Sequence, residues 1–178
     1  LAIQLRHRKN EKKERIETLD GLKFDAGKSI RYHSHLRCAW RKTDHFSKAI
    51  TLFSGTSTAF TALSSYHDIM IATSLITALF SCLDLVLGFS DKIRLYDDLY
   101  KNWSDYLVKL ERIKPSCVSE NDIIQMKEDR LKIERDEPDV MRIMERYSSA
   151  EECDARGLTK HKIWELSKCE RWFCCLIG

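Results

Sequence analysis

The sequence predicts an all-α fold, in which a two-helix transmembrane hairpin carries long cytoplasmic helical extensions and a small C-terminal helical region. The 178 residues include two prolines and six glycines, too few for the many turns of a strand-rich chain. Two nearly uncharged segments, 49–66 and 69–90, lie back to back. The charged stretch that follows them repeats apolar residues at helical spacing.

The two uncharged segments are long enough to cross a bilayer. The first has 18 residues without a formal charge, and the second has 22 residues whose only charge is Asp84. As helices they would reach about 27 and 33 Å, close to the ~30 Å hydrocarbon core. Because only a short turn separates them, we expect an antiparallel hairpin with membrane spans at about 49–66 and 69–90.

Basic residues flank this hairpin at one end only. Twelve lysines and arginines lie within residues 28–48 and 92–114, whereas the turn at 64–68 has none. The positive-inside rule therefore predicts that both termini are cytoplasmic. The charged first 25 residues lack the apolar core of a secretory signal, and seven cysteines without a CxxC pair favour a reducing compartment.

The two segments differ in how readily they would insert. The first has five strongly apolar residues, worth about −1.5 to −3 kcal/mol, and its serines and threonines subtract from that value. The second has eleven, worth about −3 to −6 kcal/mol, which can offset a cost of roughly 2.5 to 3.5 kcal/mol for Asp84. The marginal first segment leaves open a soluble bundle in which both segments are buried core helices.

Small and polar residues, three or four apart, form one face of each segment. The stripe of the second segment is Thr73, Thr77, Ser81, Asp84 and Gly88, and that of the first is Thr51, Gly55, Thr58 and Ala62. The stripes either form the contact between the two helices or, after assembly of several copies, line a hydrated pore. For Asp84 we expect hydroxyl partners from its own stripe or from Thr51 across the hairpin.

The chain divides into three predicted regions. Residues 1–27 form a charged N-terminal segment, residues 28–114 the hairpin with its extensions, and residues 115–178 a cytoplasmic C-terminal helical region. In the third region, Ser119 or Asn121 can cap the first helix. Two shorter helices follow, and the second ends in the apolar sequence WFCCLIG.

The sequence contains no recognisable catalytic motif: it has no glycine-rich phosphate loop, no GxSxG and no HExxH. His33 and His35 are two residues apart and point to different faces of a helix, so together with Cys38 they predict packing rather than a metal site. A net charge of +3 from nearly balanced charges is not typical of a nucleic-acid binder. We therefore expect no enzyme activity, no cofactor and no metal.

The middle of the chain resembles the SLATT family. It has a basic helix with HSHLRCAWRK, a first apolar segment rich in small residues, a very short turn, and a second apolar segment that runs into DKIRLYDDLYKNWSDYLVKLERI. The resemblance covers roughly residues 27–114, about half of the chain, and rests on this layout rather than on a catalytic signature. SLATT proteins are bacterial two-transmembrane effectors associated with nucleotide-second-messenger and other anti-phage defence systems.

The resemblance implies an inner-membrane effector of antiviral defence by abortive infection. Such a protein assembles as a homo-oligomer among membrane lipids and permeabilises or depolarises the membrane when a sensor protein is triggered. The sensor is expected to be of the nucleotide-signalling or reverse-transcriptase type, with residues 115–178 available for its contact and no direct contact with nucleic acid. Two alternatives remain, a soluble helical adaptor without pore activity and a phage-type holin, which usually lacks so long a cytoplasmic part.

Overall fold

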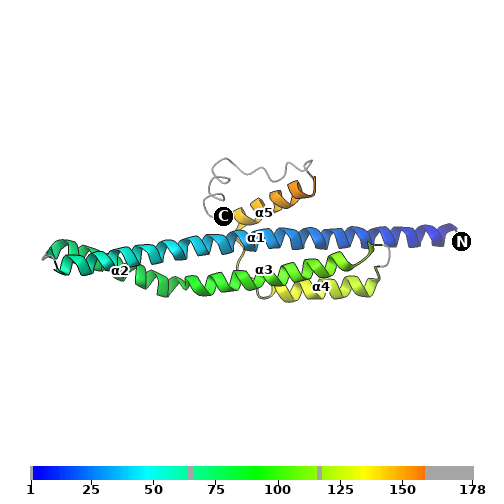
Figure 1. Ribbon diagram of the computed structural model, residues 1–178. Helices are drawn as coiled ribbons and strands as arrows, with labels where there is room; N and C mark the ends of the chain where they lie inside the picture. The colour runs from blue at the N-terminus through cyan, green and yellow to red at the C-terminus, as the bar shows by residue number, and fades with distance from the viewer. Residues whose placement is uncertain (1, 64–65, 116–117, 159–178) are drawn as a thin grey trace. The chain divides into compact units, whose positions relative to one another are not determined.

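The computed structural model describes residues 2–63, 66–115 and 118–158 (Figure 1). Within these ranges the chain forms helices and no strand, so the predicted all-α fold is confirmed for them. The helices are α1 (Ala2–Leu63), α2 (His67–Leu87), α3 (Phe89–Arg112), α4 (Glu120–Glu134) and α5 (Arg142–Ala155). The predicted C-terminal helix that ends in WFCCLIG lies outside the described residues.

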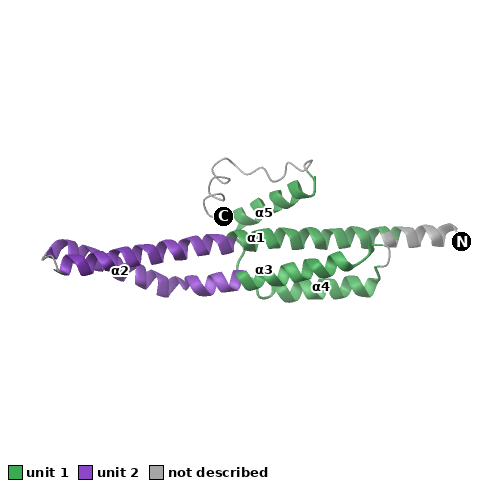
Figure 2. Ribbon diagram, in the orientation of Figure 1, with its two compact units in different colours: residues 1–35, 97–178 green, residues 36–96 purple. Residues whose placement is uncertain are grey.

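The chain packs into two compact units (Figure 2). Unit 1 consists of residues 1–35 and 97–178, and unit 2 of residues 36–96. The helix α1 continues without interruption past residue 27, where the composition of the sequence changes.

Unit 1 has an apolar core formed by α1, α3 and α4. Its members lie three or four residues apart on each helix, which places them on one helical face. They are Leu19, Leu22, Ala26, Trp103, Tyr106, Leu110, Val118, Ile123 and Met126. The indole N–H of Trp103 donates to Glu137 Oε1 at 2.5 Å, and the Tyr106 hydroxyl donates to the Met126 carbonyl at 3.1 Å. The polar ends of both buried rings are therefore satisfied.

The start of α4 is fixed by a capping box. The Ser119 hydroxyl accepts the backbone N–H of Asp122 at 3.1 Å, and the Asp122 carboxylate accepts the backbone N–H of Ser119 at 2.9 Å. The hydrogen bond from that backbone N–H lowers the pKa of Asp122. Of the two residues that the sequence offered as caps, Ser119 is the one used.

Gly88 separates α2 from α3 where the sequence predicts one continuous helix. Its backbone has φ 57° and ψ 51°, a left-handed conformation, and its N–H donates to the Asp84 carbonyl at 2.9 Å. Helical hydrogen bonding resumes at once, since the Lys92 N–H donates to the Gly88 carbonyl at 3.0 Å. Glycine takes this conformation without the steric cost that other residues meet, and it commonly caps helices in this way.

Candidate functional site

α2 is strongly apolar, yet it has no buried residue. Leu85 and Val86 are 86% and 80% exposed. The exposed large apolar residues of this helix are Ile69, Ile71, Leu75, Ile76, Leu79, Leu83, Leu85, Val86 and Leu87. A contiguous apolar surface of this kind marks a place that lipid or another protein covers.

Among the described residues, one helical stretch is long and apolar enough to cross a membrane, and it consists of α2 and its continuation in α3, from His67 to Arg112. Its most apolar part contains no buried residue, unlike the core helix of a soluble protein. The described part of the predicted span at 49–66 does not meet the same criterion, so a second membrane-crossing helix is not shown. The physical reason is the serine and threonine content of this segment, although Phe53 and Phe60 are 77% and 70% exposed.

The hydroxyls of this part of α1 are bonded to its own backbone. Thr51, Ser54, Ser57, Thr58 and Thr61 each donate to the carbonyl four residues earlier, at 2.8 to 3.0 Å. Such bonds satisfy the hydroxyl hydrogen within the helix, which lowers the cost of placing the side chain in an apolar surrounding.

In unit 2, α1 and α2 meet through hydroxyl groups. The Ser54 and Thr77 hydroxyl oxygens are 2.7 Å apart, and the Thr58 and Thr73 hydroxyl oxygens are 2.8 Å apart. Ser47, Ser54 and Thr61 of α1 are buried. We call these contacting and buried hydroxyl residues the polar seam, and its members are Ser47, Ser54, Thr58, Thr61, Thr73 and Thr77.

The predicted stripe of the second segment is divided by the structure. Thr73 and Thr77 are half-buried in the polar seam. Asp84 and Gly88 are half-buried beyond it, whereas Ser81 is exposed. Thr73 and Thr77 are therefore the members of this stripe that form hydrogen bonds with α1.

The predicted stripe of the first segment meets α2 at Thr58. Thr51 is half-buried and donates to the Ser47 carbonyl rather than to Asp84. A Cβ added at Gly55 would meet nothing within 4 Å, and Ala62 is exposed. The close helix approach expected at Gly55 is thus not made within this helix pair.

Sequence reasoning missed Ser47, Ser54 and Thr61, although a signal for them was present. The three hydroxyl residues recur every seven positions, which is two helical turns, so they share one face of α1. The predicted stripe through Gly55 follows the neighbouring face. Its small residues drew attention because they permit close approach, whereas the observed contact uses hydroxyl pairs.

A pair of opposite charges lies on α1 about two to three turns before the seam hydroxyl Ser54. Lys48 Nζ is 2.8 Å from Asp44 Oδ2, and Asp44 is only 5% exposed. The hydrogen bond to Asp44 raises the pKa of Lys48, desolvation opposes this shift, and the negative charges of Asp44 and Asp84 add to it. The other carboxylate oxygen of Asp44, Oδ1, is buried without a hydrogen-bond partner.

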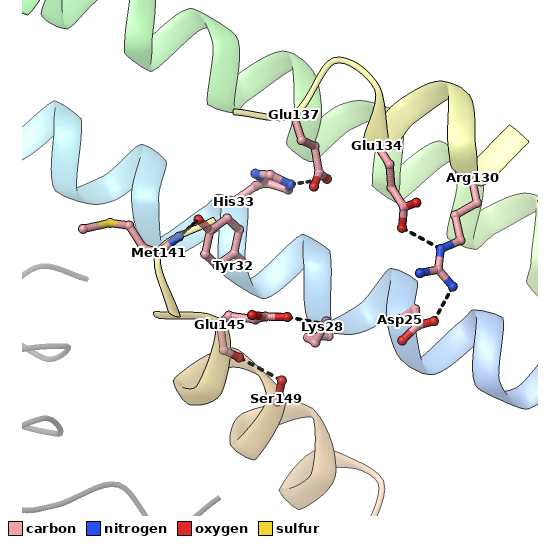
Figure 3. A network of polar contacts seen from close by, with 10 residues as sticks. All are labelled: Asp25, Lys28, Tyr32, His33, Arg130, Glu134, Glu137, Met141, Glu145 and Ser149. Atoms are coloured by element: carbon pink, nitrogen blue, oxygen red, sulfur yellow. Dashed lines mark hydrogen bonds and ion pairs between the residues drawn. The ribbon is translucent and has the colours of Figure 1, made fainter. Parts of the chain in front are cut away.

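A separate network of polar contacts in unit 1 connects α1 with α4, α5 and the segment between them (Figure 3). Its ion pairs are Arg130–Asp25 at 2.5 Å, Arg130–Glu134 at 2.7 Å and Lys28–Glu145 at 3.2 Å. His33 Nε2 is 2.9 Å from Glu137 Oε1, and the Tyr32 hydroxyl accepts the Met141 N–H at 3.0 Å. Because Arg130 and Lys28 already have carboxylate partners, the network joins α1 to α4 and α5.

His33 and His35 bind different carboxylates. His33 pairs with Glu137, and His35 Nε2 is 2.7 Å from Glu151 Oε2. Cys38 is half-buried. Within the described part of the chain, no group of three or more histidine, cysteine, aspartate or glutamate side chains could hold a metal ion.

The exposed apolar surface of α2 and the polar seam beside it are the features on which a function can be argued. Compared with protein-family models, with curated proteins and with solved structures, the chain gives no match.

Proposed function

We propose that the chain is a membrane effector of a bacterial anti-phage defence system, as its resemblance to the SLATT family implies. In this proposal it assembles in the inner membrane and permeabilises or depolarises it when a sensor partner is triggered. The observation that carries the proposal is α2, an apolar helix of 21 residues with no buried residue. Covering apolar surface is favourable by roughly 25 cal/mol per Å², and lipid would cover this helix along its whole length.

Packing within unit 1 supports a hairpin rather than a single crossing. Leu22 of α1 and Trp103 of α3 belong to one core, so the two stretches of chain that flank unit 2 lie on the same side of any membrane. The chain must then cross an even number of times within unit 2. If α2 crosses the membrane, the C-terminal end of α1 crosses with it. The hydroxyls of this end of α1 donate to carbonyls of the same helix or lie in the polar seam, which lowers the cost of placing them in lipid.

The side of the membrane follows from charge. The basic residues at 28–48 and 92–114 flank the proposed spans, and the turn between the spans has none. Both termini are therefore cytoplasmic in this proposal. There the C-terminal helical region is available to a sensor of the nucleotide-signalling or reverse-transcriptase type.

Cell fractionation followed by a depolarisation assay tests the proposal. The protein is expected to remain in inner-membrane vesicles after carbonate extraction. Co-expression with its genomic neighbours and exposure to phage should then collapse the membrane potential, read with a potential-sensitive dye. Release of the protein by carbonate would contradict the membrane assignment, and retention without any loss of potential would contradict the effector activity.

A soluble helical adaptor is the second candidate, and unit 1 favours it. The apolar core of that unit and its ion pairs are typical of a water-soluble helical module. In this case another protein, rather than lipid, would cover α2. Carbonate extraction separates the two candidates, because an adaptor would appear in the soluble fraction.

A further inference from the structure

The register of the α1–α2 pair can be followed beyond its two hydroxyl contacts. Thr58 contacts Thr73, and Ser54 contacts Thr77. The two contacts are four residues apart on each helix and run in opposite directions along the chain, as expected of an antiparallel pair. Seven further residues are two turns and return to the same face. This step reaches Ser47 on α1 and Asp84 on α2, which places these two residues opposite one another.

The residues next to Ser47 supply the charges that Asp84 faces. Ser47 is 4% exposed, and Asp44 and Lys48 lie three residues before it and one after it. Lys48 binds one oxygen of Asp44 at 2.8 Å, while the buried second oxygen has no hydrogen-bond partner. Asp84 is half-buried on the other helix, and its negative charge is the smallest of the contributions that raise the pKa of Lys48, a direction that agrees with the register.

We propose that Lys48 joins Asp44 of α1 to Asp84 of α2, so that these three side chains form a charge clamp at the end of the helix pair opposite the turn. The clamp accounts for the carboxylate inside the apolar run, since Asp84 has a cation across the pair rather than hydroxyl partners in its own helix. It also accounts for Asp44, because a buried carboxylate needs a compensating cation. Lys48 is the member of the clamp with a positive charge, and removing it would take away the ion pair with Asp44.

Zero-length carbodiimide coupling of the full-length protein tests the clamp without any substitution. The reagent joins an ammonium and a carboxylate that are already in contact, and peptide mass spectrometry identifies the pair. We expect a Lys48–Asp84 link between the helices in addition to the Lys48–Asp44 link within α1. Lys42, which is exposed on the same helix, is the control and should form no link with Asp84. Recovery of the Lys48–Asp44 link alone would overturn the proposal.

A charge exchange supplies a second test. The reporter is the yield of an engineered disulfide between S54C and T77C in a chain whose native cysteines are replaced. K48D should lower the yield several-fold because three carboxylates then lie together, and K48D combined with D84K should restore it. K42D is the matched control and should leave the yield unchanged. An equal yield in K48D and in the reporter chain, or no recovery in the double variant, would contradict the clamp.

Both tests are independent of the proposed effector function. The clamp concerns contacts within one pair of helices, and the coupling can be carried out in membranes or in solution, wherever the protein is found. A missing Lys48–Asp84 link would leave the depolarisation experiment unaffected, and an absence of depolarisation would leave the clamp intact.

Discussion

At the residue scale, two glycines of α1 differ in how much space surrounds them. A Cβ added at Gly21 would meet nothing within 4 Å, whereas one at Gly27 would collide with the carboxylate of Glu152. Glu152 is 6% exposed and is held by Arg31 at 2.8 Å and by Arg156 at 2.6 Å. Gly27 is therefore the position on α1 that gives α5 room to pack.

We predict opposite effects for alanine at these two positions. Gly21→Ala should raise the free energy of unfolding by about 0.5–1 kcal/mol, because alanine is the better helix former. Gly27→Ala should lower it by about 1–3 kcal/mol, because it displaces a buried carboxylate from its two arginines. Thermal unfolding followed by circular dichroism measures both changes. A similar gain in the two variants would contradict the packing of Glu152 on Gly27.

Because of Tyr106, the free energy of unfolding of unit 1 is expected to change with pH in the alkaline range. Burial raises its pKa from 10.0 to about 12, although the charge of Arg130 opposes the shift. The folded chain therefore keeps the phenol neutral where the unfolded chain ionises it. The stability from Tyr106 is fully present below pH 10 and is lost as the pH rises toward about 12.

We predict that Tyr106→Phe is less stable than the parent near neutral pH, by about 1 kcal/mol, since it loses the hydrogen bond to Met126. The same variant should lose less stability than the parent when the pH is raised above 10. Thermal unfolding at a series of pH values measures this difference. Parallel pH profiles for the two chains would show that Tyr106 is not protected by burial.

The sequence predicted residue roles well where apolar spacing decides them. The stretch after the second apolar segment was predicted to repeat apolar residues at helical spacing, and three of these residues, Leu99, Trp103 and Leu110, are buried, because a regular helix returns to one face every three or four residues. The seam hydroxyls and the charges near Asp84 were harder to predict. Their partners lie on another helix, and the register of two helices is decided by side-chain packing that one sequence does not display.

At the scale of the helix, Gly88 decides whether α2 and α3 are separate. It has a positive φ, and an added Cβ would meet Asp91 only at ordinary contact distance, 3.5 Å. The cost of a larger residue is therefore conformational. The sequence predicts one continuous helix instead, in which this glycine would be an ordinary helical residue.

Gly88→Ala distinguishes these two descriptions. With the left-handed backbone, alanine should lower the free energy of unfolding by roughly 1–2 kcal/mol, and Gly88→Asn should lower it less, because asparagine tolerates this conformation better. In a continuous helix, alanine would instead raise stability by up to about 1 kcal/mol. Thermal unfolding of the protein in detergent reports the sign, and a stabilised alanine variant would contradict the break at Gly88.

Gly55 allows assembly to be tested apart from the helix pair. Because the space beside it is open within one chain, Gly55→Leu should leave the α1–α2 contact intact. If copies of the chain associate through this face, the leucine should reduce the oligomers seen after cross-linking in membranes, with expression unchanged. Ala49→Leu, at an exposed position on another face of α1, is the control. An unaltered cross-linking pattern would show that the Gly55 face makes no contact between copies.

The residue at which a helix begins could be predicted from the sequence more reliably than the length of the helix. The cap at Ser119 follows from local chemistry, since its hydroxyl and the Asp122 carboxylate satisfy each other's backbone N–H groups. The 62-residue length of α1 could not be predicted in the same way. A change from charged to apolar composition marks a change of surroundings along the sequence, and a helix can pass through it without ending.

At the scale of the whole molecule, the division into two units gives the helices different surroundings. Unit 1 buries an apolar core and pairs its charges, as expected of a module in water. In unit 2, α2 has no buried residue, and hydroxyls of α1 are buried beside it. Apolar side chains outside and polar side chains between the helices are the pattern expected of helices that lie in lipid. The exposed apolar surface of α2, the polar seam and the proposed charge clamp all agree with this pattern.

The side of the membrane on which each part of the chain lies tests this description most directly. Single cysteines at Lys13, Ser65 and Ser119, in a chain without native cysteines, can be labelled with an impermeant maleimide on intact cells and after lysis. We predict that only the cysteine at position 65 is labelled from outside, and that those at positions 13 and 119 are labelled only after lysis. Labelling of position 13 or 119 on intact cells, or protection of position 65, would contradict a membrane hairpin with both termini in the cytoplasm.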